Sequence, residues 1–187
     1  MTRPIIRYAG CVLALLLPVS SSAQRPSPVA TEVDGAYPRS EAIYLDLHQH
    51  PELSFHETET AAKLAAELRT LGFDVTTGVG RMGIVGVLKN GAGPTVMLRT
   101  ELDALPVTEG TGLPYASTVR TKDDAGNDVG VMHACGHDIH MAAWIGTARI
   151  MAGNKAGWKG TLIMVGQPAE ETVSGASAMI ADGLFTR

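Results

Sequence analysis

The chain has 187 residues, a formal net charge of -4 and 45% hydrophobic residues. This length is sufficient for one sizeable core but short for two. The mild acidity and the lack of a basic stripe in the sequence argue against nucleic-acid binding and against attraction to an anionic membrane surface.

The N-terminus has the pattern of a secretory signal peptide. Arg3 and Arg7 precede a short apolar run, and Ser21 and Ala23 follow at the small-residue positions typical of a cleavage site. We therefore expect residues 1–23 to be removed and the protein to be exported, either to the periplasm or out of the cell, with no stable membrane insertion after cleavage. The alternative is an uncleaved membrane anchor, which the short run and its internal proline disfavour.

Signal removal would change the cysteine content. Cys11 would leave with the signal peptide, and Cys135 would remain alone in an exported chain. A lone cysteine cannot form an intramolecular disulfide, and a free thiol in an oxidising compartment is reactive unless it is buried or ligated. This raises the expectation that Cys135 is held as a ligand.

The next segment, residues 24–39, is rich in proline and small residues and has no apolar period, so we expect a linker there. The folded part is expected to cover residues 40–187. It opens with a predicted helix over 40–52, followed by a stronger helical pattern over 54–73. In that second pattern Ser54 and Glu57 fit a capping box, and a glycine fits the position after the last turn.

Residues 83–90 and 95–100 have the composition of buried strands, and the short "GAGP" link between them favours antiparallel neighbours. Four further elements are expected in chain order: a loop over 102–130 with a turn cluster at "DDAGND", a helix over 137–153, a central strand over 160–166 and a helix over 174–183. The alternation of strands and helices predicts an α/β fold with a mostly parallel sheet and helices on both faces.

Three stretches rich in possible ligands accompany these elements, namely "RTELDALP", "HACGHD" and "QPAEE". In an open α/β sheet, functional groups gather just beyond the carboxyl ends of the strands. We therefore expect these stretches to converge at one edge of the sheet.

The segment Met132–His140 contains three of the six histidines of the chain, together with Cys135. A metal site, a cysteine nucleophile with a histidine base, and a polar loop without function are the three interpretations. Cys135 and His137 would point to the same side of an extended segment, and a thiolate with an imidazole favours zinc or another borderline metal. His133 and His140 are rival ligands. The nucleophile ranks lower, because His137 is too close in sequence for easy pairing with the thiol.

Glu170 and Glu171 follow the predicted central strand. One carboxylate could bind a metal while its neighbour moves protons, as metal-assisted hydrolysis requires, although a solvated acidic turn is the alternative. Asp103 could orient a ligand histidine or simply form a turn. The remaining histidines are interpreted as surface or structural residues: His48, His50 and His56.

Four stretches carry a resemblance to a known family: residues 48–61, 98–107, 132–142 and 160–185. In order and spacing they resemble the M20 metallopeptidases, in particular the amidohydrolases that cleave N-acyl amino acids such as hippurate and auxin conjugates. The resemblance implies a zinc-peptidase-like α/β catalytic domain and a smaller inserted domain that mediates dimerisation. Homodimers are thus expected only of full-length relatives, and the expected substrate is a small N-acyl amino acid or peptide.

The resemblance also implies roles for individual residues. Cys135 would bridge two divalent ions, zinc or manganese, while His137 and Glu171 would be further ligands. Glu170 would be the general base that activates water, and Asp103 would support the site. No other cofactor is implied.

Two features depart from the family pattern. Glu101 stands where the family commonly has an aspartate, and the chain stops at Arg187. The resemblance implies that family members continue with two more histidine ligands, the inserted domain and the last strands. We therefore expect residues 40–187 to be the N-terminal part of a catalytic domain, incomplete at its C-terminus. The alternative function is a non-catalytic fragment that binds metal weakly or not at all.

Overall fold

The computed structural model describes residues 28–186. The expected signal peptide, residues 1–23, lies outside the described residues, as does the start of the expected linker, residues 24–27. None of the helices in the described part combines the length and apolarity needed to cross a membrane.

The expectation of a linker up to residue 39 is wrong from residue 28 onward, because helix α1 runs from Pro28 to Gln49. Its first half lacks an apolar period but packs on helix α3 (His137–Gly153). Ala36 is buried, and a Cβ built on Gly146 would lie only 2.7 Å from Ser40 Oγ. Small side chains thus let the two helices approach closely, and tertiary packing stabilises a helix that the local pattern does not predict.

Helix α2 (Thr58–Thr70) presents the predicted apolar face to the core. Leu64 and Leu68 are completely buried, and Gly72 adopts the expected left-handed conformation after the last turn, with φ of 84°. The apolar period of the sequence therefore located this helix correctly.

The predicted capping box of α2 is wrong. The carboxylate of Glu52 caps the helix by accepting hydrogen bonds from the backbone N–H groups of Glu59 (3.1 Å) and Thr60 (2.8 Å). Ser54 and Glu57 instead turn their side chains toward the loops at the carboxyl edge of the sheet. The chain folds back before the helix and brings Glu52 to its N-terminus, which frees both residues for the site described below.

The main sheet contains four strands: β1 (Asp74–Val79), β2 (Gly83–Asn90), β3 (Thr95–Glu101) and β6 (Gly160–Gln167). Their order is β1-β2-β6-β3, with antiparallel β1–β2 and β2–β6 pairs and a parallel β3–β6 pair. Two sequence predictions are therefore wrong: β2 and β3 are not neighbours, and the sheet is mixed instead of mostly parallel. The β2–β3 link can cross the start of β6 because glycines meet there. A Cβ on Gly93 would lie 2.7 Å from the Lys159 carbonyl oxygen, and one on Gly160 would overlap the Pro94 carbonyl oxygen.

Strand β3 was expected to be buried but lies at an edge of the described sheet. Val96, Met97 and Leu98 are 56%, 49% and 36% exposed, since only β6 pairs with this strand in the described residues. Strand β6 is central, as predicted.

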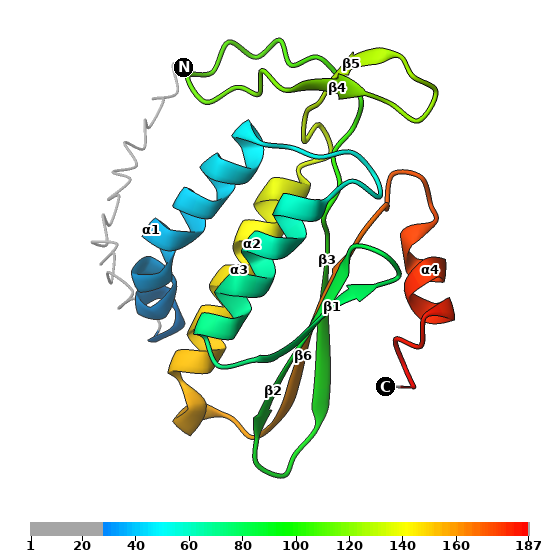
Figure 1. The fold of residues 1–187 in the computed structure, drawn as a ribbon. Coiled ribbons are helices and arrows are strands. Elements are labelled where there is room, and N and C mark those ends of the chain that lie inside the picture. Colours follow the sequence, from blue (N-terminus) through cyan, green and yellow to red (C-terminus); the bar gives the residue numbers. More distant parts are fainter. Residues whose placement is uncertain (1–27, 187) are drawn as a thin grey trace, which may run out of the picture.

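Helices cover both faces of the sheet, as predicted (Figure 1). Helices α1, α2 and α3 pack on one face, where Leu64, Ile84 and Met164 belong to one buried cluster. Helix α4 (Gly175–Ala181) packs on the other face, where Met179 belongs to a second buried cluster with Val165 and Val79.

The predicted loop over 102–130 contains a hairpin of two short strands, β4 (Arg120–Lys122) and β5 (Asp128–Gly130). The "DDAGND" cluster forms its turn, as expected, and Asp123 Oδ1 accepts hydrogen bonds from the N–H groups of Ala125 and Asn127. A single 3-10 turn, Lys155–Gly157, precedes β6.

Candidate metal centre

The parallel strands β3 and β6 end side by side, with Glu101 paired to Gln167. The loops that follow carry Asp103 and the Glu170–Glu171 pair, and α3 begins against them with His137. The predicted convergence at the carboxyl edge is therefore confirmed for these residues.

His137 is the buried centre of the cluster, with a side chain only 6% exposed. Its Nδ1 donates a hydrogen bond to the Asp103 carbonyl oxygen at 2.8 Å and lies 3.5 Å from Asp103 Oδ1. This leaves Nε2 to face Glu170 Oε2 at 3.7 Å and Glu171 Oε1 at 3.9 Å. Burial lowers the pKa of His137, but hydrogen bonding and the charge of Asp103 outweigh burial and raise this pKa to about 9.

Asp103 is completely buried and connects three parts of the chain. Its Oδ2 accepts hydrogen bonds from Ser54 Oγ at 2.6 Å and from the Glu171 backbone N–H at 3.0 Å. Burial tends to raise the pKa of Asp103, but the hydrogen bonds of His137, Ser54 and the Glu171 backbone lower it overall. Asp103 is thus held ionised, and it orients the histidine and the carboxylate loop together.

The loop that carries the two glutamates is fixed by a residue whose role the sequence did not reveal. Ala169 has a positive φ of 48°, and its N–H donates to Glu57 Oε1 at 2.7 Å. Glu57 is fully buried, and desolvation is the main cause of its raised pKa. Because Glu57 matches a helix cap in sequence, no local signal distinguishes this distant contact.

Cys135 is exposed just before α3. Hydrogen bonding to the Glu171 carboxylate is the main cause of its raised pKa, with smaller contributions from burial and from the charges of Glu171, Glu170 and Asp103. The thiol therefore lies at the cluster, and without a cation these carboxylates keep it protonated.

Two sets of side chains in residues 28–186 have donor atoms within 4.8 Å of one another: His137, Glu170 and Glu171 form the first, and Glu101, His137 and His140 form the second. Glu171 Oε1 is buried without a hydrogen-bonding partner of normal geometry. Imidazole, carboxylate and a nearby thiol are the donors that zinc and similar ions prefer. The residues therefore fit a divalent cation, while the predicted role of each one stays a prediction.

The other histidines lie apart from this set of donors. His48 is buried, with Nδ1 2.6 Å from Asp138 Oδ2 and Nε2 3.2 Å from Glu109 Oε1. It is therefore a hydrogen-bonded structural histidine, one of the two roles that the sequence analysis allowed. His133 is buried with neither ring nitrogen hydrogen-bonded, and burial lowers its pKa to about 4. Two exposed histidines, His50 and His56, form surface contacts with Asp46 and Asp124.

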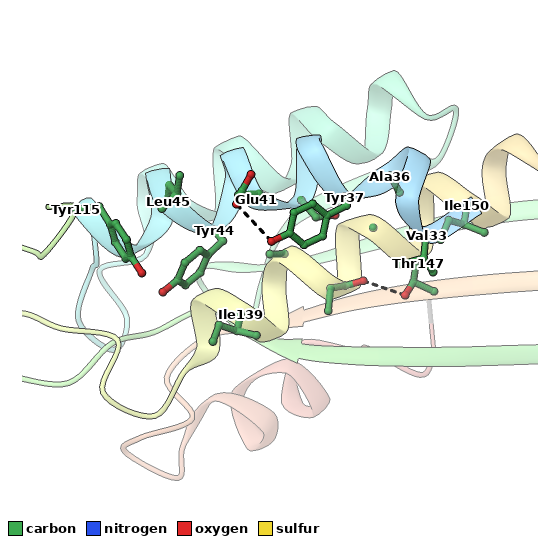
Figure 2. Close-up of a pocket in the computed structure, with 14 residues that line it drawn as sticks. Val33, Ala36, Tyr37, Glu41, Tyr44, Leu45, Tyr115, Ile139, Thr147 and Ile150 are labelled. Carbon is green, nitrogen blue, oxygen red and sulfur yellow. Dashed lines mark hydrogen bonds between the residues drawn. The ribbon is translucent and has the colours of Figure 1, made fainter. Parts of the chain in front are cut away.

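A mostly apolar groove of about 680 Å³ lies between α1 and α3 (Figure 2). Val33, Tyr37, Tyr44, Tyr115 and Ile139 are among its lining residues, and none of the potential metal donors is. The chemistry of the donors and their mutual distances place the candidate centre at the sheet edge and not in this groove.

Comparison with known proteins points the same way. Residues 97–187 match the family model described as peptidase family M20/M25/M40. The chain is similar to a hippurate hydrolase from Campylobacter jejuni, with 41% identity over 148 residues that cover 79% of this chain and 36% of that protein. It is also similar to an N-acetylcysteine deacetylase from Bacillus subtilis, with 40% identity over 142 residues, 75% of this chain and 35% of that protein. The chain thus spans little more than a third of these curated relatives.

A solved structure shares the fold. The YXEP protein of Bacillus subtilis, described as a dinuclear metal-binding peptidase of the M20 family, aligns with a TM-score of 0.71 and 37% identity, over 81% of this chain and 40% of that one. The resemblance and the α/β fold class predicted from sequence are thereby confirmed.

Proposed function

From the M20-family sequence and fold that this chain carries, we propose that it forms part of a metal-dependent amidohydrolase. The proposed substrates are N-acyl amino acids or related small amides and peptides, the class to which the names of its hippurate-hydrolase and N-acetylcysteine-deacetylase relatives point. The observation that carries this proposal is the meeting of His137 Nε2 with the Glu170 and Glu171 carboxylates at the sheet edge.

His137, Glu171 and Cys135 would hold the divalent ions, proposed to be two zinc or manganese ions in a complete site. When bound, such ions lower the pKa of water and stabilise negative charge that develops on the amide oxygen. Glu170 is the proposed general base, because its side chain is 41% exposed and can reach both solvent and the cluster.

Two buried carboxylates would keep these groups in place. Asp103 holds the Nδ1 side of His137 and so presents Nε2 to the cluster. Glu57 binds the Ala169 N–H and so fixes the start of the loop that carries the proposed base. Neither carboxylate needs to touch the substrate to affect the rate.

The test is hydrolysis of N-acetyl and N-benzoyl amino acids by the full chain loaded with zinc or manganese. Glu170→Gln should lower kcat by about a hundredfold or more, as expected for a general base. Glu59→Gln, an exposed residue of α2, is the matched control and should have no effect. Hydrolysis that survives Glu170→Gln unchanged would contradict the proposed role.

A non-catalytic fragment that binds metal weakly is the second candidate. The exposed apolar residues of β3, with a strand partner on one side only in the described part, favour it, because an unpaired edge promotes association instead of an ordered site. Metal-dependent light scattering without turnover by the full chain would support this second candidate.

We also propose that the protein is exported. We expect homodimers only of full-length relatives. The basic residues, apolar run and small residues within positions 1–23 support export. Cell fractionation with N-terminal sequencing tests it: a mature chain starting at Gln24 is expected, and a cytoplasmic chain that retains Met1 would refute it.

A further inference from the structure

A buried histidine outside the candidate centre connects the segments on both sides of Cys135. His48, at the end of α1, places Nδ1 2.6 Å from Asp138 Oδ2 and Nε2 3.2 Å from Glu109 Oε1. Asp138 belongs to the first turn of α3, and Glu109 belongs to the loop that follows β3. We call these three residues the His48 tie. The roles proposed above use none of them.

The His48 tie consists of charged groups held in the interior. The side chains of His48, Glu109 and Asp138 are only 7%, 0% and 2% exposed. Ionised carboxylates only accept hydrogen bonds, so both ring nitrogens of His48 must donate. Burial lowers the pKa of His48, but its hydrogen bonds to Asp138 and Glu109 outweigh burial and raise it. Burial also tends to raise the pKa of Glu109, but hydrogen bonds, chiefly from Thr111 and the Ser117 N–H, lower it overall.

Aromatic rings enclose this imidazole. The ring centroids of Tyr44 and Tyr115 lie 5.6 and 5.4 Å from that of His48, and the two tyrosine rings meet edge-on at 5.8 Å (Figure 2). Charges interact more strongly where water is excluded, so the enclosure strengthens the hold of the imidazole on its two carboxylates.

Each carboxylate of the His48 tie also binds the backbone of its own segment. Asp138 Oδ1 accepts a hydrogen bond from the Ile139 N–H at 2.8 Å, and Glu109 Oε2 accepts one from the Ser117 N–H at 2.6 Å. The histidine is thereby connected to the backbone of the first turn of α3 and to the backbone of the loop after β3.

The turn that carries Cys135 has little support of its own. Gly136 precedes α3 in the left-handed conformation, with φ of 79°, and no side chain caps the helix at this position. The side chain of Cys135 is exposed, so core packing does not hold it. The placement of the thiol relative to the imidazole of His137 therefore depends on how the two flanks of the turn are held.

The His48 tie connects both flanks of this turn. Upstream, Met132 exchanges two backbone hydrogen bonds, of 3.0 and 3.1 Å, with Leu105, in the loop that carries Glu109. Downstream, Asp138 lies in the first turn of α3. One imidazole thus joins the loop and the helix between which the thiol lies.

We propose that His48 is a positioning residue of the candidate metal centre, which fixes the placement of Cys135 relative to His137. This inference rests on the proposed function, in which both residues hold the divalent ions, and deepens it by naming the group that orders them. Asp103 holds the Nδ1 side of His137, so the two supports act on different parts of the same centre.

A network that only stabilises the fold would behave differently. Its removal would lower the free energy of unfolding, as the loss of one partner of a buried ion pair does, but would leave the metal affinity of the folded chain unchanged. Leu64→Ala, at a fully buried position of α2, destabilises the core without touching the His48 tie and is the matched control. His50→Ala, at an exposed histidine just beyond α1, is the second control.

The first measurement is calorimetric titration of the metal-free full chain with Zn²⁺, together with the visible spectrum of bound Co²⁺. Circular dichroism verifies that each variant is folded under the conditions used. The neutral amide of His48→Gln cannot place a donor at both ring-nitrogen positions. This variant should weaken Zn²⁺ binding by about tenfold or more, the scale for loss of a group that orients metal ligands, and should change the Co²⁺ spectrum. Glu109→Gln should act in the same direction and add little to His48→Gln, because both act through one contact.

The second measurement needs no metal. Alkylation of the Cys135 thiol by iodoacetamide, read at the Cys135 peptide by mass spectrometry, should be faster in metal-free His48→Gln than in wild type. The reason is that the loosened turn no longer holds the thiol beside the Glu171 carboxylate, which disfavours the reactive thiolate. Both controls should keep the wild-type alkylation rate and the wild-type Zn²⁺ affinity.

Any one of three results would overturn the inference: wild-type Zn²⁺ affinity in His48→Gln, a wild-type rate of Cys135 alkylation in His48→Gln, or equal weakening of Zn²⁺ binding by Leu64→Ala. Failure of the proposed function has a different signature, namely hydrolysis that survives Glu170→Gln. The alkylation rate of the metal-free chain is independent of that result.

Discussion

Asp103→Asn should abolish a pH dependence of stability that the metal-free chain shows between pH 6.5 and pH 9. The folded-state pKa of His137 is about 9, against 6.5 in the unfolded chain. A histidine with a raised pKa contributes stability that is fully present below pH 6.5 and is lost as the pH rises through about 9. The two values differ by about 2.5, and about 1.4 kcal/mol per pKa unit gives a loss of about 3–4 kcal/mol.

Asp103 is the main source of this stabilisation, because burial alone would lower the pKa of His137. The neutral asparagine keeps the shape of the side chain but removes the charge. We therefore expect Asp103→Asn to lower the free energy of unfolding by about 3–4 kcal/mol more at low pH than at high pH. His48 also has a raised pKa, but it is present in both proteins and cancels in the difference.

The assay is urea unfolding in the presence of a chelator at about pH 6 and about pH 9.5. Fluorescence of the buried Trp144 reports the transition. Asp128→Asn, at an exposed carboxylate paired with Lys122, is the control and should leave the pH dependence intact. If the free energy of unfolding falls by the same amount between about pH 6 and about pH 9.5 in wild type and in Asp103→Asn, Asp103 is not the cause of the raised pKa of His137.

Three further predictions follow from buried positions around the site. Glu57→Gln should raise the urea midpoint at neutral pH. The pKa of the buried Glu57 is raised above 4.5, so ionising this carboxyl costs the folded chain stability as the pH rises, and the neutral glutamine avoids that cost. An unchanged or lower midpoint would contradict this reasoning. Gly175→Ala should weaken Zn²⁺ binding by about tenfold or more in a calorimetric titration, because its Cβ would overlap the Pro168 carbonyl oxygen and displace the glutamate loop. Leu64→Ala, at a fully buried position of α2, should lower the free energy of unfolding measured in urea by about 2–5 kcal/mol. A loss below about 1 kcal/mol would contradict this and would show that the surrounding core closes around the space left by the leucine.

The sequence alone predicted the elements whose pattern is local. Helix α3, strand β6 and helix α4 lie where the apolar spacing and the flanking glycines put them, because period and turn chemistry act within a few residues. The types of donor at the candidate centre were also readable, since thiol, imidazole and carboxylate recur in short motifs. Their convergence followed from the rule that strand ends carry the functional loops.

Tertiary structure decided what depends on distant partners. Strand β6 inserts between β2 and β3, and α1 forms against α3 despite the weak pattern of its first half, because strand pairing and helix packing are long-range choices. Glu57 matches a cap in sequence, yet it binds the Ala169 N–H, 112 positions away. The sequence thus specified which donors the chain has. Only the fold determined which of them face His137, because the pKa and the binding role of a carboxylate depend on the charges and hydrogen bonds around it.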